Sequence, residues 1–276
     1  MKVTASLVNE LRKKTGAGMM DCKKALVEAE GDMETAIDLL RKKGQKVAAK
    51  RGDNETKEGL VIAKTVDGNK KGIILSLSCE TDFVAKNSDY YAFVDSLVDA
   101  AIANGVNSVE DFVASQFDDK LTVEEKLTEQ IGVIGEKLEL TNLNVIEAES
   151  VVVYNHPGNQ IASIVGLTKD SDTATDAGRQ VAMQIAAMAP IALNKDQVDQ
   201  STIDRELEVG KELAIQEGKP AEMADKIAQG RLNKFFKENT LLSQPFIKDN
   251  KKSVEQFLNE SESGLTVKDF KRVALK

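Results

Sequence analysis

Two segments of the chain share one order of features: a strand, a glycine–asparagine turn, a second strand and a helix. Gly68-Asn69 and Gly158-Asn159 mark the two turns, because Gly and Asn accept the left-handed backbone that tight hairpin turns require. The flanking residues alternate in polarity or are mostly apolar, which is typical of strands. We expect strands at 59–66 and 72–79, a long helix, a second helix from Thr122 and an extended stretch at 138–149, then strands at 151–155 and 161–168 and a helix over 172–189. The repeat predicts an α+β fold with a two-subdomain core of antiparallel strands.

The first 44 residues predict three short helices in a small bundle. Thr4 and Asp32 are placed to cap the first and third helices, and Gly44 is a natural helix stop. This arrangement resembles the ubiquitin-associated type of binding module. Residues 1–51 carry 12 Lys and Arg against 7 Asp and Glu, a net charge of +5. The last part of this segment, from 41 to 51, holds six basic residues and no acidic one, which indicates a linker or a solvated helix end.

Residues 201–238 interrupt the second unit with a predicted helical hairpin. Gly218-Lys219-Pro220 forms the corner, and Gly210 and Gly230 lie at similar distances from it, where small residues let helices approach. After 244–246 we expect one more capped helix and a closing strand. The predicted division is a docking bundle with basic linker at 1–51, core subdomains at 55–149 and at 150–200 with 239–276, and an inserted coiled-coil arm at 201–238.

Composition mainly excludes functions. The 276 residues carry a net charge of -8, which argues against direct nucleic-acid binding, since phosphate contacts need a basic face. One histidine, His156, and two distant cysteines give no zinc site, so the thiols are expected to be buried and reduced. The longest apolar run, 185–193, is far shorter than the roughly 18 residues of a membrane span. With no signal-peptide pattern at the N-terminus, we expect a cytoplasmic protein without membrane contact.

Catalytic and nucleotide motifs are missing from the sequence. There is no GxxxxGK[ST] loop, and Gly16-Ala17-Gly18 does not continue as a dinucleotide fingerprint. His156 lies beside a proline in a turn, with no GxSxG pattern to supply a nucleophile. Acidic pairs such as Glu124-Glu125 fall on exposed helix positions. We therefore expect no enzyme activity and no cofactor.

Two places break the local rules. Met19 and Met20 open a helix directly after a glycine-rich turn, and adjacent residues of a helix point about 100° apart. Either one is a core residue and the other is exposed by chance, or both serve a docking surface. The second place is the stretch 80–85, Glu-Thr-Asp-Phe-Val-Ala, after a core strand. Either Asp82 caps the next helix while Phe83 packs into the core, or the two form an exposed acidic-aromatic wedge.

Four stretches together carry a family resemblance. They are TGAGMMDCKKAL at 15–26, TDFVA at 81–85, GKP at 218–220 with Gly230-Arg231, and QPF at 244–246. Their order and spacing resemble the bacterial translation elongation factor Ts family over essentially the whole chain. The resemblance implies a guanine-nucleotide exchange factor for elongation factor Tu, without covalent chemistry.

The resemblance also implies roles for particular residues. Asp82 and Phe83 are expected to reach toward the magnesium bound to Tu, with Thr81 and Val84 flanking them. This contact would disturb the magnesium and phosphate site and so promote release of GDP. The expected complexes are with the GDP-bound and the nucleotide-free forms of Tu.

Docking contacts follow from the same resemblance. The N-terminal bundle is expected to dock on the G domain of Tu through Met19 and Met20. The second core unit is expected to hold another domain of Tu, with His156 and Gly158 as the matching turn residues.

The sequence departs from the family pattern at several points. Gln160 stands where members often have Arg, and Gln184 stands where they often have His, so family contacts from these two positions are not expected. The additional C-terminal helix of some members has no counterpart before Lys276, and its contact with the G domain is expected to be missing.

Other interpretations come from different classes of protein. A ubiquitin-associated-like bundle on an α/β body fits an adaptor that binds peptides or nascent chains without exchange activity. An acid-based hydrolase would need a cleft of paired carboxylates, which no spacing requires. The arm at 201–238 offers a surface for self-association, for contact with Tu, or for neither.

Overall fold

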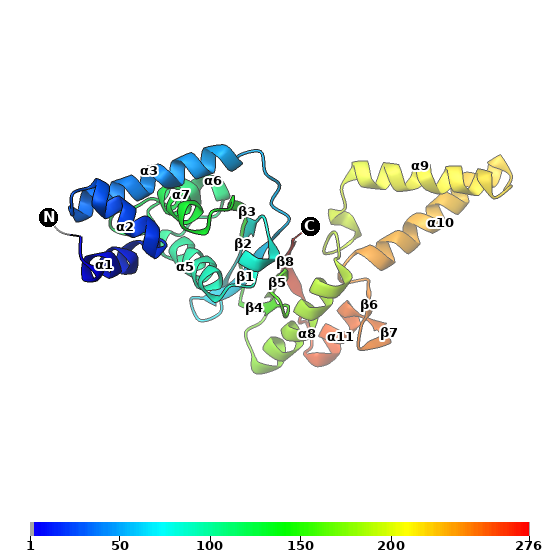
Figure 1. Ribbon diagram of the computed structural model, residues 1–276. Helices are drawn as coiled ribbons and strands as arrows, with labels where there is room; N and C mark the ends of the chain where they lie inside the picture. Colours follow the sequence, from blue (N-terminus) through cyan, green and yellow to red (C-terminus); the bar gives the residue numbers. More distant parts are fainter. Residues whose placement is uncertain (1–2, 276) are drawn as a thin grey trace.

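The computed structural model describes residues 3–275, apart from the side chain of Ala221. Figure 1 shows a row of three parts: a helical bundle at the N-terminal end, a body of strands and helices, and a projecting helical arm at the other end. The α+β class is confirmed, with antiparallel sheets in the body. No helix within residues 3–275 combines the length and apolar character that crossing a membrane requires.

Three helices form the bundle: α1 (Ala5–Thr15), α2 (Met19–Glu28) and α3 (Met33–Arg51). The predicted caps are confirmed, because Thr4 accepts from Leu7 N–H at 3.3 Å and Asp32 accepts from Thr35 N–H at 2.8 Å. Leu11, Cys22, Leu26 and Ala36 are among the buried side chains between the helices. A likeness to ubiquitin-associated modules stays a prediction.

The expected helix stop at Gly44 is wrong, since α3 continues to Arg51. Gly44 is buried and faces α7, where a Cβ atom would lie 2.5 Å from the carbonyl oxygen of Thr128. Gly132 of α7 lies at the same crossing, and its own Cβ would be 2.7 Å from the Gly44 Cα. The glycine pair therefore lets two helix backbones touch. The basic stretch at 41–51 is the end of a helix and not a linker.

The first half of the body is a three-stranded sheet with helices on one face. Its strand order is β1-β2-β3, all antiparallel. The helix expected from Thr122 is α7, which begins with a capping box of Thr122 and Glu125. The elements are β1 (Glu58–Val66), β2 (Lys71–Cys79), α4 (Asp82–Ala85), α5 (Ser88–Asn104), α6 (Val109–Ala114), α7 (Val123–Ile134) and β3 (Glu139–Glu147). Side chains from the sheet and from α5, α6 and α7 make the largest buried cluster.

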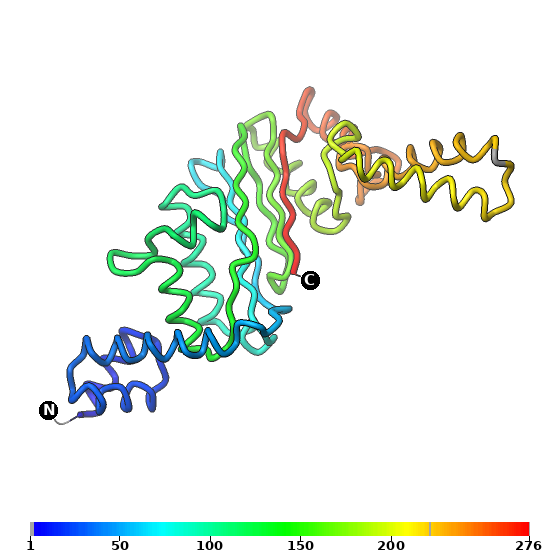
Figure 2. Tube along the Cα trace, turned by 90° about the horizontal axis from the view of Figure 1, so that it is seen from above, coloured from blue at the N-terminus to red at the C-terminus, as the bar shows by residue number. Residues whose placement is uncertain are grey.

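The second half repeats the plan with a sheet in the order β4-β5-β8. Helices α8 and α11 cover its outer face and enclose a separate buried cluster. Its elements are β4 (Ser150–Asn155), β5 (Ile161–Leu167), α8 (Asp172–Met188), η1 (Lys195–Gln197), β6 (Pro245–Phe246), β7 (Asp249–Ser253), α11 (Val254–Ser261) and β8 (Val267–Ala274). Figure 2 shows the strands of both sheets between two groups of helices.

The two sheets are joined by a shared core and by their turns. Val61, Ile74, Ile146 and Ile164 are among the residues buried between the sheets. Each hairpin turn also bonds to the first strand of the other hairpin. Val61 N–H donates to Asn159 O at 2.6 Å, and Val151 N–H donates to Asn69 O at 2.5 Å. Val151 follows Val61, and Asn159 follows Asn69, by the same 90 positions. The two bonds are therefore reciprocal, as a two-fold axis between the two units would make them.

The arm consists of α9 (Gln200–Gln216) and α10 (Ala221–Asn239), which confirms the predicted helical hairpin. Figure 1 shows it projecting from the body. Gly210 allows close packing, since a Cβ there would lie 3.2 Å from the Cα of Ala228. The matching expectation for Gly230 is wrong, because a Cβ there would meet no atom within 4 Å.

Candidate partner-binding site

Phe83 is the most exposed large apolar side chain of the body. It belongs to the four-residue helix α4, which begins three residues after the end of β2, and 85% of its surface is accessible. The expectation that Phe83 packs into the core is therefore wrong. Its neighbours Val84 and Ala85 pack against the large buried cluster instead. The helix is attached on one side and presents an aromatic ring to solvent on the other.

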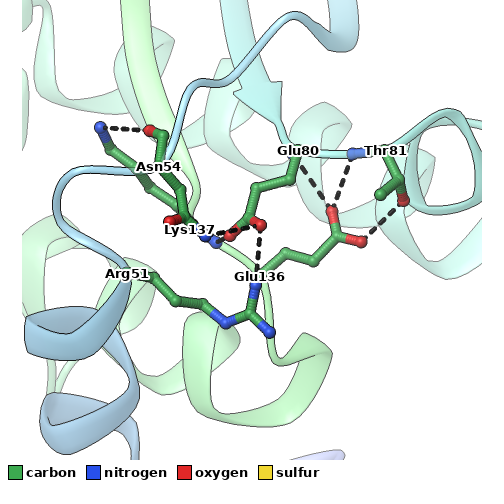
Figure 3. Close-up of polar contacts among 6 residues, drawn as sticks. All are labelled: Arg51, Asn54, Glu80, Thr81, Glu136 and Lys137. Carbon is green, nitrogen blue, oxygen red and sulfur yellow. Dashed lines mark hydrogen bonds and ion pairs between the residues drawn. The ribbon is translucent and has the colours of Figure 1, made fainter.

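Glu136 fixes the backbone just before this helix (Figure 3). Its carboxylate accepts from the N–H groups of Glu80 and Thr81 at 3.1 and 3.0 Å. The Thr81 hydroxyl donates to the other carboxylate oxygen at 2.6 Å. Thr81 is the N-cap residue of α4 but makes no side-chain cap bond to the helix, because its hydroxyl is turned to Glu136.

Glu80 joins the same strand end to other elements (Figure 3). Its carboxylate accepts from Arg51 at 2.7 Å, from Asn54 at 2.9 Å and from Lys137 N–H at 2.5 Å. Burial alone would raise the pKa of Glu80. These donors outweigh that effect and hold its pKa below the ordinary value of 4.5. The side chain is therefore an ionised carboxylate whose hydrogen bonds link the end of α3, the following loop and the residues just before β3.

Asp82 is the first residue of α4 and not its cap, so the capping interpretation is wrong. Its carboxylate is half exposed and pairs with Lys86 at 2.6 Å, one helical turn later. The hydrogen bond from Lys86 lowers the pKa of Asp82. An ionised carboxylate therefore occupies the position directly before the exposed Phe83.

Cys79 and Tyr90, the thiol and the phenol near this helix, are both buried. Both thiols, Cys22 and Cys79, are buried and unpaired with one another, as predicted. Burial raises the pKa of Cys79 to about 11. The buried Tyr90 hydroxyl donates to Leu77 O at 2.8 Å, and burial raises its pKa as well. Neutral, bonded groups of this kind support a rigid base and not a nucleophile.

Met19 and Met20 are both exposed, at 53% and 63%. The interpretation with one methionine in the core is therefore wrong. Both border an open groove of about 360 Å³, and Val3 and Val8 of the first helix region are among its other lining residues. Flexible, polarisable methionines beside a shallow apolar groove are typical of a docking surface.

A second groove lies between the bundle and the helix that carries Phe83. It has a volume of about 490 Å³, and its lining residues include Gly16 of the bundle, Val84, Phe93 and Val133. Gly16 comes three residues before Met19. The groove therefore runs from the turn that precedes the exposed methionines to α4.

His156 and Gly158 lie in the exposed turn between β4 and β5. His156 Nδ1 and the Tyr154 hydroxyl are 2.9 Å apart. Gln160 donates to the Glu58 carboxylate at 3.3 Å, and Glu58 pairs with Cys79 across the sheet. The turn is therefore brought to the same end of the sheet as α4.

Gln184 has a different environment from the other predicted positions. It is fully buried, and its amide donates to Gln244 Oε1 and Pro245 O, both at 3.1 Å. Its oxygen accepts from Ile247 N–H at 2.8 Å. Both ends of this side chain are used inside the body, between α8 and the segment that follows the arm.

Sequence reasoning did not single out Glu136 or Arg51. The available signal for Glu136 was a charged residue directly after Gly135, which ends α7 with a positive φ of 81°. In so short a connection between a helix and a buried strand, a carboxylate can adopt few orientations and reach few donors. Its partners, 55 and 56 positions earlier, could not be read from local pattern.

An exposed aromatic ring on a fixed helix, beside open grooves, is the kind of surface through which one macromolecule binds another. Within residues 3–275, no three His, Cys, Asp or Glu side chains are grouped to hold a metal ion. Comparison with known proteins gives the particular family. The family model described as Elongation factor TS matches residues 80–276.

Three relatives named elongation factor Ts match nearly the whole chain. The protein of Christiangramia forsetii is 54% identical over 99% of this chain and 99% of its own length. That of Amoebophilus asiaticus is 50% identical with the same coverage, and that of Flavobacterium psychrophilum is 47% identical over 99% and 98%. The chain belongs to the elongation factor Ts family. Membership implies nucleotide exchange on elongation factor Tu during translation elongation.

Proposed function

We propose that this chain promotes GDP release by inserting Phe83, with Asp82 beside it, into the G domain of elongation factor Tu near the bound magnesium. The observation that carries the proposal is an 85% exposed phenylalanine on a helix that is fixed to the body. A rigid support matters, because a ring on a mobile loop would yield on contact and transmit little force. Thr81 and Val84 serve as the attached flanks of this wedge.

The mechanism follows from how a GTPase holds its nucleotide. Backbone groups cradle the phosphates, and a magnesium ion bridges protein and nucleotide oxygens. An aromatic ring pushed between elements of the G domain shifts the groups that position the ion. Weakening the ion site then weakens the phosphate site, with no covalent step. By linkage, nucleotide lowers the affinity of the factor by the same ratio as the factor lowers the affinity of nucleotide.

Phe83 cannot supply the whole effect. A release rate raised about 10⁴-fold requires a barrier lowered by roughly 5.5 kcal/mol. One buried phenylalanine contributes on the order of 1.5 to 3 kcal/mol. We infer that the bundle, through Met19 and Met20, and the β4–β5 turn, through His156 and Gly158, supply the remainder by binding to the G domain and to a second domain of Tu. Gln184 takes no part, because both ends of its amide are bonded internally.

The experiment measures release of fluorescent GDP from Tu over a range of factor concentrations. Phe83→Ala is expected to bind Tu but to lower the maximal release rate at least tenfold, since about 1.4 kcal/mol corresponds to one decade. Met223→Ala is the control, because Met223 is a 51% exposed apolar residue of the arm and its loss leaves α4 unchanged. Release by Phe83→Ala at the unmodified rate would rule out the wedge.

The same measurement tests the adaptor interpretation. An adaptor for peptides or nascent chains would leave GDP release from Tu unchanged at every concentration of the unmodified chain. The family relationship does not favour that interpretation. Self-association through the arm is a separate proposal, which sedimentation of the purified chain tests directly.

A further inference from the structure

The helix that presents Phe83 is too short to hold itself in place. Four residues complete little more than one turn, and isolated turns of helix are unstable in water. Its orientation must therefore come from attachments outside the helix. On the C-terminal side, Val84 and Ala85 pack against the buried cluster. On the N-terminal side, the attachment is the carboxylate of Glu136.

The contacts of Glu136 are all directed to one place. Two backbone N–H groups and one hydroxyl donate to it, all three from Glu80 and Thr81. Within residues 3–275, no Lys or Arg pairs with this carboxylate in an ion pair. Glu80 differs, since its side chain bonds to three separate parts of the chain. The side chain of Glu80 thus ties elements together, whereas Glu136 fixes the residues immediately before α4.

A carboxylate suits this task better than an amide. Both of its oxygens accept, and hydrogen bonds to an ionised acceptor are shorter and stronger than those between neutral groups. A glutamine in its place has one accepting oxygen and one donating nitrogen. If that nitrogen faces the two backbone N–H groups, both of their bonds are lost; if it faces Thr81, the hydroxyl must turn to accept from it. In either case the negative charge that strengthens the three bonds is lost.

We propose that Glu136 is a positioning residue of the exchange reaction. Through Thr81 it holds α4 in the orientation that aims Phe83 at the partner, although Glu136 itself touches no part of that partner. This inference rests on the proposed function of Phe83. A positioning role predicts that Glu136 affects the maximal rate of GDP release and not the affinity of docking, which depends on other surfaces.

Two single variants test the role. Glu136→Gln removes the double acceptor, and Thr81→Val removes the hydroxyl while keeping the shape of the side chain. Each is expected to lower the maximal rate of fluorescent GDP release about tenfold, as the weakening or loss of one to two charge-assisted hydrogen bonds predicts. The concentration of factor that gives half of the maximal rate should stay within about twofold of the unmodified value. Thermal unfolding of both variants checks that the body is intact.

The decisive measurement is a double-mutant cycle with Phe83→Ala. If Glu136 acts only by aiming the ring, Glu136→Gln has no further effect once the ring is gone. An equal loss of rate with and without Phe83 would overturn the positioning role, as would a raised half-saturating concentration with the maximal rate unchanged. If the proposed role of Phe83 is wrong, the single variant Phe83→Ala shows it separately, because that variant would then promote GDP release from Tu at the unmodified rate. If Glu136→Gln does not fold, the cycle is completed with Thr81→Val.

Discussion

The guanidinium of Arg51, the last residue of α3, lies 2.7 Å from the carboxylate of Glu80 at the end of β2. Helix α3 has 19 residues, which at 1.5 Å per residue is a rod of about 28 Å. The helix and this ion pair together connect the bundle to the segment that leads into α4. Through this pair the bundle and the segment that carries Phe83 belong to one continuous, bonded framework.

Replacing Glu80 should destabilise the fold. Glu80→Gln leaves Arg51 with a neutral partner and weakens the bonds from Asn54 and Lys137, so we expect a loss of about 1–3 kcal/mol in the free energy of unfolding. Urea denaturation measures this loss. Lys57→Ala is the matched control, because Lys57 and Glu55 form an ion pair that is exposed on both sides and should contribute almost nothing.

The same carboxylate predicts a dependence on pH. The pKa of Glu80 is lower in the folded protein than its ordinary value of 4.5. Its contribution to stability is therefore complete above that value and is lost as the pH falls below it through the folded pKa. The difference in unfolding free energy between the unmodified chain and Glu80→Gln should be larger at about pH 6 than at about pH 3.5. A difference that stayed constant over this range would contradict the assignment.

Two glycines in helices should respond oppositely to alanine. Gly44→Ala places a methyl group against the backbone of α7, so the two helices must separate, at a cost of about 1–3 kcal/mol. Gly230→Ala meets open space in α10 and should stabilise the protein by roughly 0.5–1 kcal/mol. Thermal unfolding of both variants checks the contrast. Equal effects would contradict a direct backbone contact between α3 and α7 at Gly44.

The exposed methionines should act on affinity. A double variant, Met19→Ala with Met20→Ala, removes apolar surface from the bundle without touching α4, so the concentration for half-maximal GDP release should rise roughly tenfold or more. The maximal rate should fall as well, but by less than in Phe83→Ala, because the bundle supplies only part of the energy that lowers the barrier. An unchanged half-maximal concentration would contradict the docking role of the two methionines.

Periodic elements were predictable from the sequence, whereas their contacts were not. The hairpins, α5, the capped α7 and the arm follow from alternation, caps and turn residues, which are local properties. Gly44 was misread because a glycine that ends a helix and one that allows two helices to touch look alike until the second helix is placed. The prediction of close helix packing at Gly230 was wrong for the opposite reason, because no second helix approaches that glycine.

The candidate site also has parts that the sequence predicts and parts that it does not. The motif at 81–85 and the paired methionines were identified as unusual. The exposure of Phe83 depends on how Val84, Ala85 and Glu136 attach the helix, and the last of these lies more than 50 positions away in the chain. An aromatic residue that follows a strand would ordinarily pack inward. Only the three-dimensional arrangement shows that its two neighbours take the place in the core.

The reciprocal bonds of the two turns have a consequence for how the body unfolds. Val61 and Val151 each depend on an acceptor supplied by the opposite hairpin, and residues of both sheets are buried together. If the chain were divided between positions 149 and 150 and the halves were separated, each would have an unpaired edge donor and an uncovered apolar face. The two halves should therefore melt in a single transition, so that neither can serve as an independently folding module of the chain.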